Sequence, residues 1–463
     1  MELFSDKAGD EGLPGRPRAL AMAAVMTSTT MAVFDGSMVN IALPQIAAAL
    51  KVSAPAAVWV ANGYLLAAAM TLAIFAALAS RFGFRLLFAC GLSLFTAASL
   101  GCALSSSLTT LTGWRIVQGI GGAATLSIAP AILRSVFPDR LLGRILGLHA
   151  LLIAASTALA PLLGGTLLAA LDWRWLFAVN LPLGAIALML TLRVIPGKKA
   201  PQREPFDVAG AWLSAIMLGA LIMTASTFSR PDKDDGMLFT ALAYGALAIT
   251  AGVLFVWRQQ RAPKPLLPLA MFASRRFSLA ALTSLASFVS QGMTFVALPF
   301  LFQSVYGYSA FESALLFTPW PLGIILVAPH AGRMADRHSP ALISTLGLCV
   351  FAVGLALLAL LPDRAAMWDI GVRSLVCGLG FGCFQSPNNR EMLSNVSREN
   401  SGYASGVLAI MRTFGQCLGA ALVGVILSLS NNALAVHLSL WVAALATVLA
   451  LLFSVSRLRI WRV

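Results

Sequence analysis

Hydrophobic residues in this chain come in long runs, each about as long as a membrane-crossing helix. Roughly 20 apolar residues in a helix span a hydrocarbon core of about 30 Å, and such runs recur fourteen times. Their centres lie near Met31, Leu66, Leu94, Leu126, Ala155, Leu183, Met217, Ala246, Phe288, Leu322, Leu348, Gly378, Gly415 and Ala444. The pattern predicts an all-α polytopic membrane protein with 14 transmembrane helices.

Composition supports this class. The 463 residues are 59% hydrophobic and only 11% charged, and the mean hydropathy is +0.85, which excludes a water-soluble domain. The stretch before Leu20 is polar and contains proline, without a cleavage-site pattern. The first span is therefore predicted to be a retained helix and not a signal peptide.

The net charge of +14 has a topological explanation. With the N-terminus in the cytoplasm, the inner segments hold 24 Lys and Arg and the outer loops hold five. The positive-inside rule then places both termini on the cytoplasmic side, and we expect the chain in the cytoplasmic (inner) membrane. This distribution accounts for the basicity without a nucleic-acid partner.

The chain repeats itself at an offset of about 256 residues. Ala42-Leu43-Pro44 recurs as Ala297-Leu298-Pro299, and Ser53-Ala54 recurs as Ser309-Ala310; further matches pair Ser80-Arg81 with Asp336-Arg337, Arg115 with Arg373, and Pro130 with Pro387. This register predicts two six-helix bundles in the same orientation, separated by two inserted helices.

The predicted organisation follows from these features. It comprises a cytoplasmic N-terminal tail (1–18), an N-terminal six-helix bundle (19–196), a linker with two additional transmembrane helices (197–276), a C-terminal six-helix bundle (277–456) and a cytoplasmic C-terminal tail (457–463).

Asp35 is the most informative single residue, because an ionised carboxylate deep in an apolar span is costly and calls for a functional reason. Counted along their helices at about 1.5 Å per residue, Asp35 and Arg115 reach nearly the same depth. We expect them to pair. A change in their separation would couple conformational change to proton uptake or release, and the alternative is a static salt bridge between spans 1 and 4.

A permissive substrate cavity is predicted from neutral polar and aromatic residues in the spans. The repeat places Tyr64 opposite Trp320, which lies between Pro319 and Pro321 where the helix must be kinked. The candidates are Asn62, Tyr64, Gln118, Phe288, Gln291, Phe295, Trp320, Phe384 and Gln385. The alternative for each aromatic residue is contact with lipid or a neighbouring helix.

Two further arginines, Arg373 and Arg412, are predicted to lie deep within spans and to need partners. Helix packing is the default interpretation, with gating or contact with an anion as alternatives. The six cysteines and the histidines His149 and His330 show no metal-ligand spacing, so neither a metal nor another cofactor is expected.

Several motifs together resemble the major facilitator superfamily, specifically its fourteen-span drug:proton antiporter branch. They are Phe34–Pro44 in span 1, Arg115–Ala123 in span 4, and Trp173–Phe177 followed by Asn180-Leu181-Pro182. The antiporter motif of span 5 is matched, with small-residue substitutions, by Gly147, Ser156, Ala160, Pro161, Gly164 and Gly165. The resemblance covers residues 19–457 and implies the major facilitator fold.

One departure concerns the cytoplasmic gate that the resemblance implies. The loop after span 2 has Ser80 where the family usually has an acid, followed by Arg81 and Arg85, whereas the second copy keeps the acid in Asp336-Arg337. Asp336 could pair with a basic residue or cap a helix and so close the cytoplasmic side. We therefore expect the two halves to contribute unequally to this gate.

These observations predict a monomeric, proton-gradient-driven antiporter that exports amphipathic organic compounds by alternating access. A proton symporter, a dedicated metabolite exporter that could take an anion, and a non-transporting membrane sensor are the alternatives. No constellation typical of an enzyme occurs. The expected partners are a small-molecule substrate, protons and the lipid bilayer.

Overall fold

The structure, a computed structural model, describes residues 12–197, 206–229, 236–335, 337–396, 401–429 and 433–460, which contain helices and no strands. Thirteen segments within these ranges are long and apolar enough to cross a membrane. Helix α5 spans 32 residues and includes the apolar stretch Ala155–Ala170. Counted with α5, the described helices account for the 14 predicted spans.

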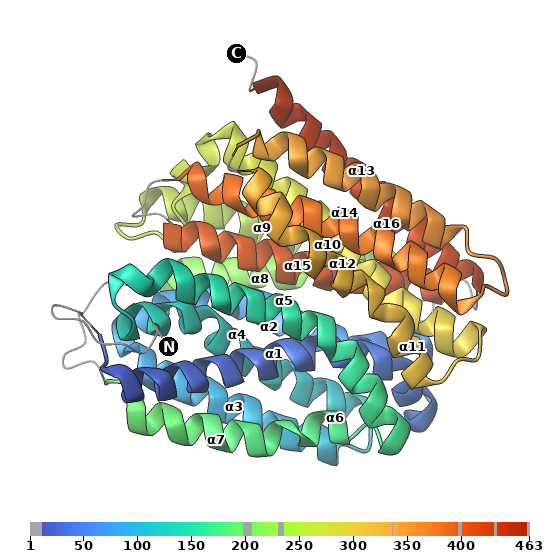
Figure 1. Ribbon diagram of the computed structural model, residues 1–463, viewed down its shortest axis with the longest axis horizontal. Coiled ribbons are helices and arrows are strands. Elements are labelled where there is room, and N and C mark those ends of the chain that lie inside the picture. The colour runs from blue at the N-terminus through green and yellow to red at the C-terminus, as the bar shows by residue number, and fades with distance from the viewer. Residues whose placement is uncertain are drawn as a thin grey trace.

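The helices form two bundles and an inserted pair (Figure 1). The N-terminal half comprises α1 (Gly15–Leu50), α2 (Ala54–Phe82), α3 (Phe84–Leu104), α4 (Leu108–Val136), α5 (Asp139–Ala170), α6 (Trp175–Ala178) and α7 (Asn180–Val194). The C-terminal half comprises α10 (Arg275–Phe300), the π-helical η3 (Leu301–Val305), α11 (Ala310–Phe317), α12 (Pro319–Met334), α13 (Pro340–Ala359), α14 (Met367–Ser394), α15 (Ser401–Leu429) and α16 (Ala433–Ile460). Between them lie α8 (Val208–Thr227), α9 (Met237–Arg261) and the 3-10 helix η2 (Leu269–Ala273).

The predicted break in span 10 is present. The span is divided into α11 and α12, with Thr318 between them and Pro319 at the start of the second helix. A proline nitrogen carries no hydrogen to donate and its ring restricts the backbone, so the helix is interrupted at this point. At the other end of the chain, α16 continues through Arg457 to Ile460, where the sequence predicted the start of a tail.

The internal repeat is visible in how glycines pack. A Cβ on Gly121 would lie 2.7 Å from the carbonyl oxygen of Gly91 and against the backbone of Phe95. A Cβ on Gly380 would likewise lie 2.9 Å from the carbonyl oxygen of Gly347 and against the backbone of Phe351. The contacted residues of the two halves, Gly91 and Gly347, are 256 residues apart, whereas Gly121 and Gly380 are 259 apart. Arg115 lies on the same helix as Gly121, so the offset of 259 applies to it. The predicted match of Arg115 with Arg373, at an offset of 258, is therefore one residue out of register. Ser374 is the residue in the equivalent place.

The two halves share their largest core at one end. We call the end at which α1 begins and α16 ends the terminal end, and the opposite one the distal end. The largest core joins distal residues of both halves, including Ile46 of α1 and Phe302 of η3. Toward the terminal end the cores are separate: one belongs to the N-terminal half and another to the C-terminal half and η2. Figure 1 shows the distal end on the right, where α11 of the C-terminal half lies beside α5.

Helix α8 packs along the line where the halves meet beside α2 and α15. Ile222 of α8 shares a core with Ala69 of α2 and Cys417 of α15, and Gly219 of α8 approaches Met70 of α2. We call this line the α2–α15 seam. The inserted pair therefore touches both halves.

Asp207 is the N-cap residue of α8 and lies just before the membrane-spanning part of that helix. Its carboxylate accepts hydrogen bonds from Gly210 N at 3.0 Å, Arg258 Nε at 2.9 Å and Gln259 Nε2 at 2.7 Å. Burial alone would raise the pKa of Asp207, but these hydrogen bonds and the Arg258 charge outweigh it and lower the pKa below the ordinary value of 3.8. The residue thus links the linker to both inserted helices.

We expect Asp207→Ala to reduce the free energy of unfolding in detergent by about 1 to 2 kcal/mol at pH 7. Because the folded-state pKa is lowered, this contribution is present above the ordinary carboxyl pKa and is lost as the pH falls through the folded-state value. The difference between Asp207→Ala and the parent should therefore shrink at acidic pH, as measured by thermal unfolding. Asp369→Ala, which removes a partly exposed acid, is the control; a pH-independent difference for Asp207 would contradict the expectation.

Candidate functional site

The structure brings Asp35 and Arg115 together, as their matching depths predict. Asp35 lies on α1 and Arg115 on α4, and the Arg115 Nη1 atom forms an ion pair with the Asp35 Oδ2 atom. The exposed fractions of the two side chains are 1% and 0%. The pair is sealed inside the N-terminal half and does not face water.

Three neutral polar residues complete the surroundings of Asp35. Gln118 Nε2 donates to Asp35 Oδ1 at 2.9 Å, and Asn180 Nδ2 of α7 donates to the same oxygen at 3.1 Å. Both amides also donate to Ser99 Oγ of α3, at 2.8 and 3.3 Å. The carboxylate is thus held from α4 and α7, with α3 supporting both donors.

Arg115 has partners of its own. Its Nε donates to the carbonyl oxygen of Val60 at 2.9 Å and its Nη1 to Gln118 Oε1 at 2.7 Å. The guanidinium carbon lies 4.5 Å from the centre of the Tyr64 ring and 5.5 Å from that of Phe177, within the range of cation–π attraction. Among the described residues, Arg115 Nη2 has no partner.

This arrangement defines two chemical states. In the structure, the side chains of Arg115, Gln118 and Asn180 donate to Asp35 and stabilise the charged carboxylate, because an ionised group out of water needs such hydrogen bonds. Protonating Asp35 would remove the counter-charge and leave Arg115 uncompensated in a dry site, which is costly. Proton uptake must therefore be accompanied by separation of the pair or by entry of water.

The residues predicted to line a cavity fall into different places. Tyr64 and Gln118 belong to the Asp35 site; the Tyr64 hydroxyl donates to the carbonyl oxygen of Ala32 at 3.1 Å. The predicted aromatics of the C-terminal half are Phe288, Phe295, Trp320 and Phe384. Together with Phe317, Phe351 and Phe381 they form one buried series, with neighbouring ring centres 5.2 to 5.6 Å apart. These aromatics therefore pack against neighbouring helices, which is the alternative to lining a cavity.

The remaining candidates for the cavity are neutral polar residues of both halves. Asn62 Oδ1 of α2 lies 2.9 Å from Cys417 Sγ of α15, which connects the two halves. Gln291 of α10 accepts a hydrogen bond from Gln416 Nε2 of α15 at 2.9 Å. Gln385 is half-buried on α14.

The predicted gate is only partly described. The side chains of Ser80 and Arg81 and the whole of Asp336 lie outside the described residues. Arg85 donates to the carbonyl oxygen of Leu192 near the end of α7, and Arg337 is exposed. Arg373 pairs with Asp369 one turn away on the same helix, at 2.9 Å and partly exposed.

The antiporter motif of α5 points its small residues at both halves. Gly164 faces Met38 of α1, whereas a Cβ on Gly165 would meet Ala314 and lie 2.8 Å from the carbonyl oxygen of Ala310, both on α11 of the other half. Ser156, Ala160 and Pro161 are buried; the side-chain surroundings of Gly147 lie outside the described residues. Gly165 thus permits the close contact of the halves at the distal end.

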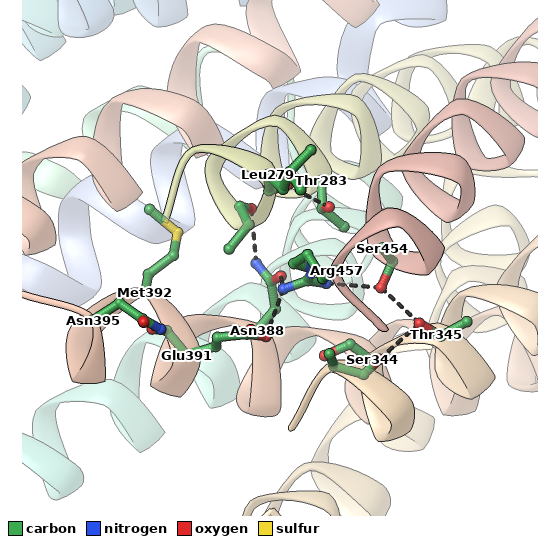
Figure 2. A network of polar contacts seen from close by, with 12 residues as sticks. Leu279, Thr283, Ser344, Thr345, Asn388, Glu391, Met392, Asn395, Ser454 and Arg457 are labelled. Atoms are coloured by element: carbon green, nitrogen blue, oxygen red, sulfur yellow. Dashed lines mark hydrogen bonds and ion pairs between the residues drawn. The ribbon is translucent and has the colours of Figure 1, made fainter. Parts of the chain in front are cut away.

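The structure contains a second buried ion pair, which was not predicted from the sequence. Arg457 of α16 donates from Nη1 to Glu391 Oε2 and to Asn388 Oδ1 of α14, both at 2.8 Å, and from Nη2 to Ser454 Oγ at 2.7 Å (Figure 2). Glu391 and Arg457 are 3% and 0% exposed. Glu391 is thus a second deeply buried acid in the described part of the bundles. Both Glu391 and Arg457 lie in the last turns of their helices, where the sequence favours contact with water.

The chain belongs to the major facilitator superfamily: residues 25–420 match that family. It is 40% identical over 447 residues to the uncharacterized transporter YebQ of Escherichia coli (strain K12), with 96% of each chain covered. It is 32% identical to the tetracenomycin C resistance and export protein of Streptomyces glaucescens, covering 90% of this chain and 77% of the relative. A POT family transporter crystallised with a thioalcohol-conjugated peptide is similar in fold, with a TM-score of 0.73 at 14% identity and 95% and 96% of the two chains covered.

The helical architecture and these relationships agree. The protein is a multi-pass membrane transporter with the major facilitator fold, and it is not an enzyme.

Proposed function

We propose that this transporter is a proton-coupled antiporter of the fourteen-span drug:proton type, which exports amphipathic organic compounds from the cytoplasm. The observation that carries the proposal is Asp35, a dry carboxylate whose charge depends on Arg115, Gln118 and Asn180. A site of this kind binds and releases a proton only if its helices move, which is what coupling requires. The printed name of the relative from Streptomyces glaucescens supports the export direction.

The arrangement of the cores supports alternating access. The halves share a core at the distal end and have separate cores toward the terminal end. With the terminal end in the cytoplasm, as the positive-inside rule predicts, this is the inward-facing state. Protonation of Asp35 would accompany the change to the outward-facing state or the return from it.

The test is transport by the purified protein in liposomes with an imposed pH gradient, using an amphipathic dye as the probe. Antiport requires that dye and protons move in opposite directions, so that a proton gradient drives dye accumulation. Movement of both in the same direction would show a symporter. Absence of transport for every compound in a chemically diverse panel would favour a membrane sensor.

Gly165 provides a test of the alternating-access part. In a background lacking the six native cysteines, Gly165→Val should prevent close contact with α11 and shift the population toward distal opening by about tenfold, because overpacking a tight contact costs roughly 1–3 kcal/mol. Ser313→Cys on α11 reports the change: its side chain is fully buried beside this contact, so labelling by a membrane-impermeant thiol reagent from the distal side should rise.

Gly164→Val is the matched control, because Gly164 faces Met38 within the same half. Its Ser313→Cys labelling should stay near that of the parent. Equal labelling in the parent and in Gly165→Val would show that this contact does not close the distal end.

A further inference from the structure

Arg412 differs from three other arginines that the structure describes in the bundles. Arg115, Arg373 and Arg457 each pair with an acid. Arg412 is half-buried on α15 and has no hydrogen-bond or ion-pair partner among the residues that the structure describes. A guanidinium at such a depth is costly unless water or an anion accompanies it.

The position of Arg412 rules out the usual way in which such a charge reaches water. Both α5 and α15 begin at the terminal end, and Arg412 lies about 17 Å along α15. It is therefore close to the middle of its span, too far from either end for its side chain to extend to the membrane surface.

Arg412 lies close to the opposite half. Its charge is near enough to the imidazole of His149 on α5 for the two to interact electrostatically, and His149 lies about 15 Å along that helix, at nearly the same depth. His149 Nε2 is 3.0 Å from Thr29 Oγ1 of α1. A cation from one half and a polar pair from the other thus meet near the middle of the bundle.

Neutral polar groups continue this face of α15. Gln416 follows Arg412 by one helical turn and therefore lies on the same side of the helix. It bonds Gln291 of α10 at 2.9 Å. The surface next to Arg412 thus offers amide groups, which suit the polar atoms of a small organic molecule.

Charge counting indicates what Arg412 binds. Of the acids that the structure describes, the two buried deep in the bundles, Asp35 and Glu391, are each neutralised by their own arginine. Among the described residues of the two bundles, Arg412 is thus left as a positive charge without an acid beside it. A cationic substrate would be repelled there, whereas a carboxylate or sulfonate would supply the missing partner.

We propose that Arg412 binds the acidic group of the transported substrate, so that the substrate class is an organic anion with an apolar body, held between Arg412 and the His149–Thr29 pair. The direction and coupling of its transport rest on the proposed function. The substrate class itself rests on the binding site. Binding and coupling can therefore be tested separately.

The binding test compares aromatic anions with cations of the same body, such as naphthalene-2-sulfonate and trimethyl(naphthalen-2-yl)ammonium, by thermal stabilisation of the purified protein and by titration. We expect the anions to stabilise the protein and the cations not to do so. Arg412→Gln should weaken anion binding by about tenfold to a hundredfold, which is the usual contribution of a charge-assisted hydrogen bond to affinity. Arg412→Lys should retain part of the affinity.

Arg373→Gln is the matched control, because it removes an arginine that already has an acid partner, and it should leave anion binding unchanged. If Arg412→Gln does not fold, the comparison of anions with cations in the unmodified protein and the Arg412→Lys titration decide the question. Failure of every anion in the panel to bind, or equal anion binding by Arg412→Gln and the parent, would overturn the inference.

Transport separates this result from the proposed function. Exchange of one anion for one proton moves two positive charges inward per cycle, so an inside-negative potential should accelerate it, whereas exchange of a monocation for one proton is electroneutral. Anion binding that depends on Arg412 without proton exchange would support the substrate class and contradict antiport. Proton-driven export of the cation alone would support antiport and overturn the substrate class.

Discussion

Asp35→Asn should abolish proton-driven accumulation of substrate in liposomes, lowering it by about a hundredfold or more, while substrate binding stays within a few-fold of the parent. The amide keeps the volume of the side chain and can still accept from Gln118 and Asn180, but it cannot carry a proton. Substrate transport is then no longer coupled to proton movement, although the side chain at position 35 still fills its place. The measurement is dye accumulation under an imposed pH gradient, with binding followed by titration in detergent.

Asp172→Asn is the control for this experiment, because Asp172 is half-exposed and pairs with Arg174 away from the buried site. Its accumulation should equal that of the parent. Accumulation by Asp35→Asn at the parental rate would remove Asp35 from the coupling mechanism and leave the Asp35–Arg115 pair with a purely structural role.

The second large effect concerns stability. Arg457→Leu should lower the free energy of unfolding by about 3 to 5 kcal/mol, because it leaves Glu391 as an uncompensated buried charge. Unfolding in mixed micelles with increasing denaturing detergent measures the change. The double variant Glu391→Leu with Arg457→Leu should recover most of the loss, since replacing both partners of a buried pair by apolar residues is often neutral.

Arg373→Leu is matched to this experiment, because Arg373 pairs with Asp369 in a partly exposed place and such pairs contribute roughly 0 to 1 kcal/mol. A similar small loss for Arg457→Leu would mean that water reaches Glu391. In that case the terminal end of the C-terminal half would be looser than the contacts in Figure 2 indicate.

The hydrophobic pattern predicted the spans and their break near Trp320 because chain length and proline act locally. The Asp35–Arg115 contact was also predictable, since two opposite charges at one depth in a low-dielectric bundle seek each other. Asn180 was not recognised as part of this site, although its motif was noted. A neutral amide carries no signal that distinguishes a partner of Asp35 from a surface residue.

Glu391 and Trp320 show where the sequence is insufficient. Depth along a helix can be counted from the chain, but the direction of a side chain around the helix depends on packing between helices. Glu391 therefore looked like a residue at a helix end, whereas Arg457, Asn388 and Ser454 enclose it. Trp320 lies at a broken helix, as predicted, but it is 1% exposed and packs on Phe295 and Phe351 inside its own half.

The position of α8 has a consequence for the route by which lipid-dissolved compounds enter. Hydrophobic molecules concentrate in the bilayer, and a transporter of two bundles offers them two lateral seams. Here Ile222 of α8 seals one seam, between α2 and α15, by packing on Ala69 and Cys417. Compounds arriving sideways from the bilayer are left with the seam on the α5 side, so recruitment from the membrane is expected to be one-sided.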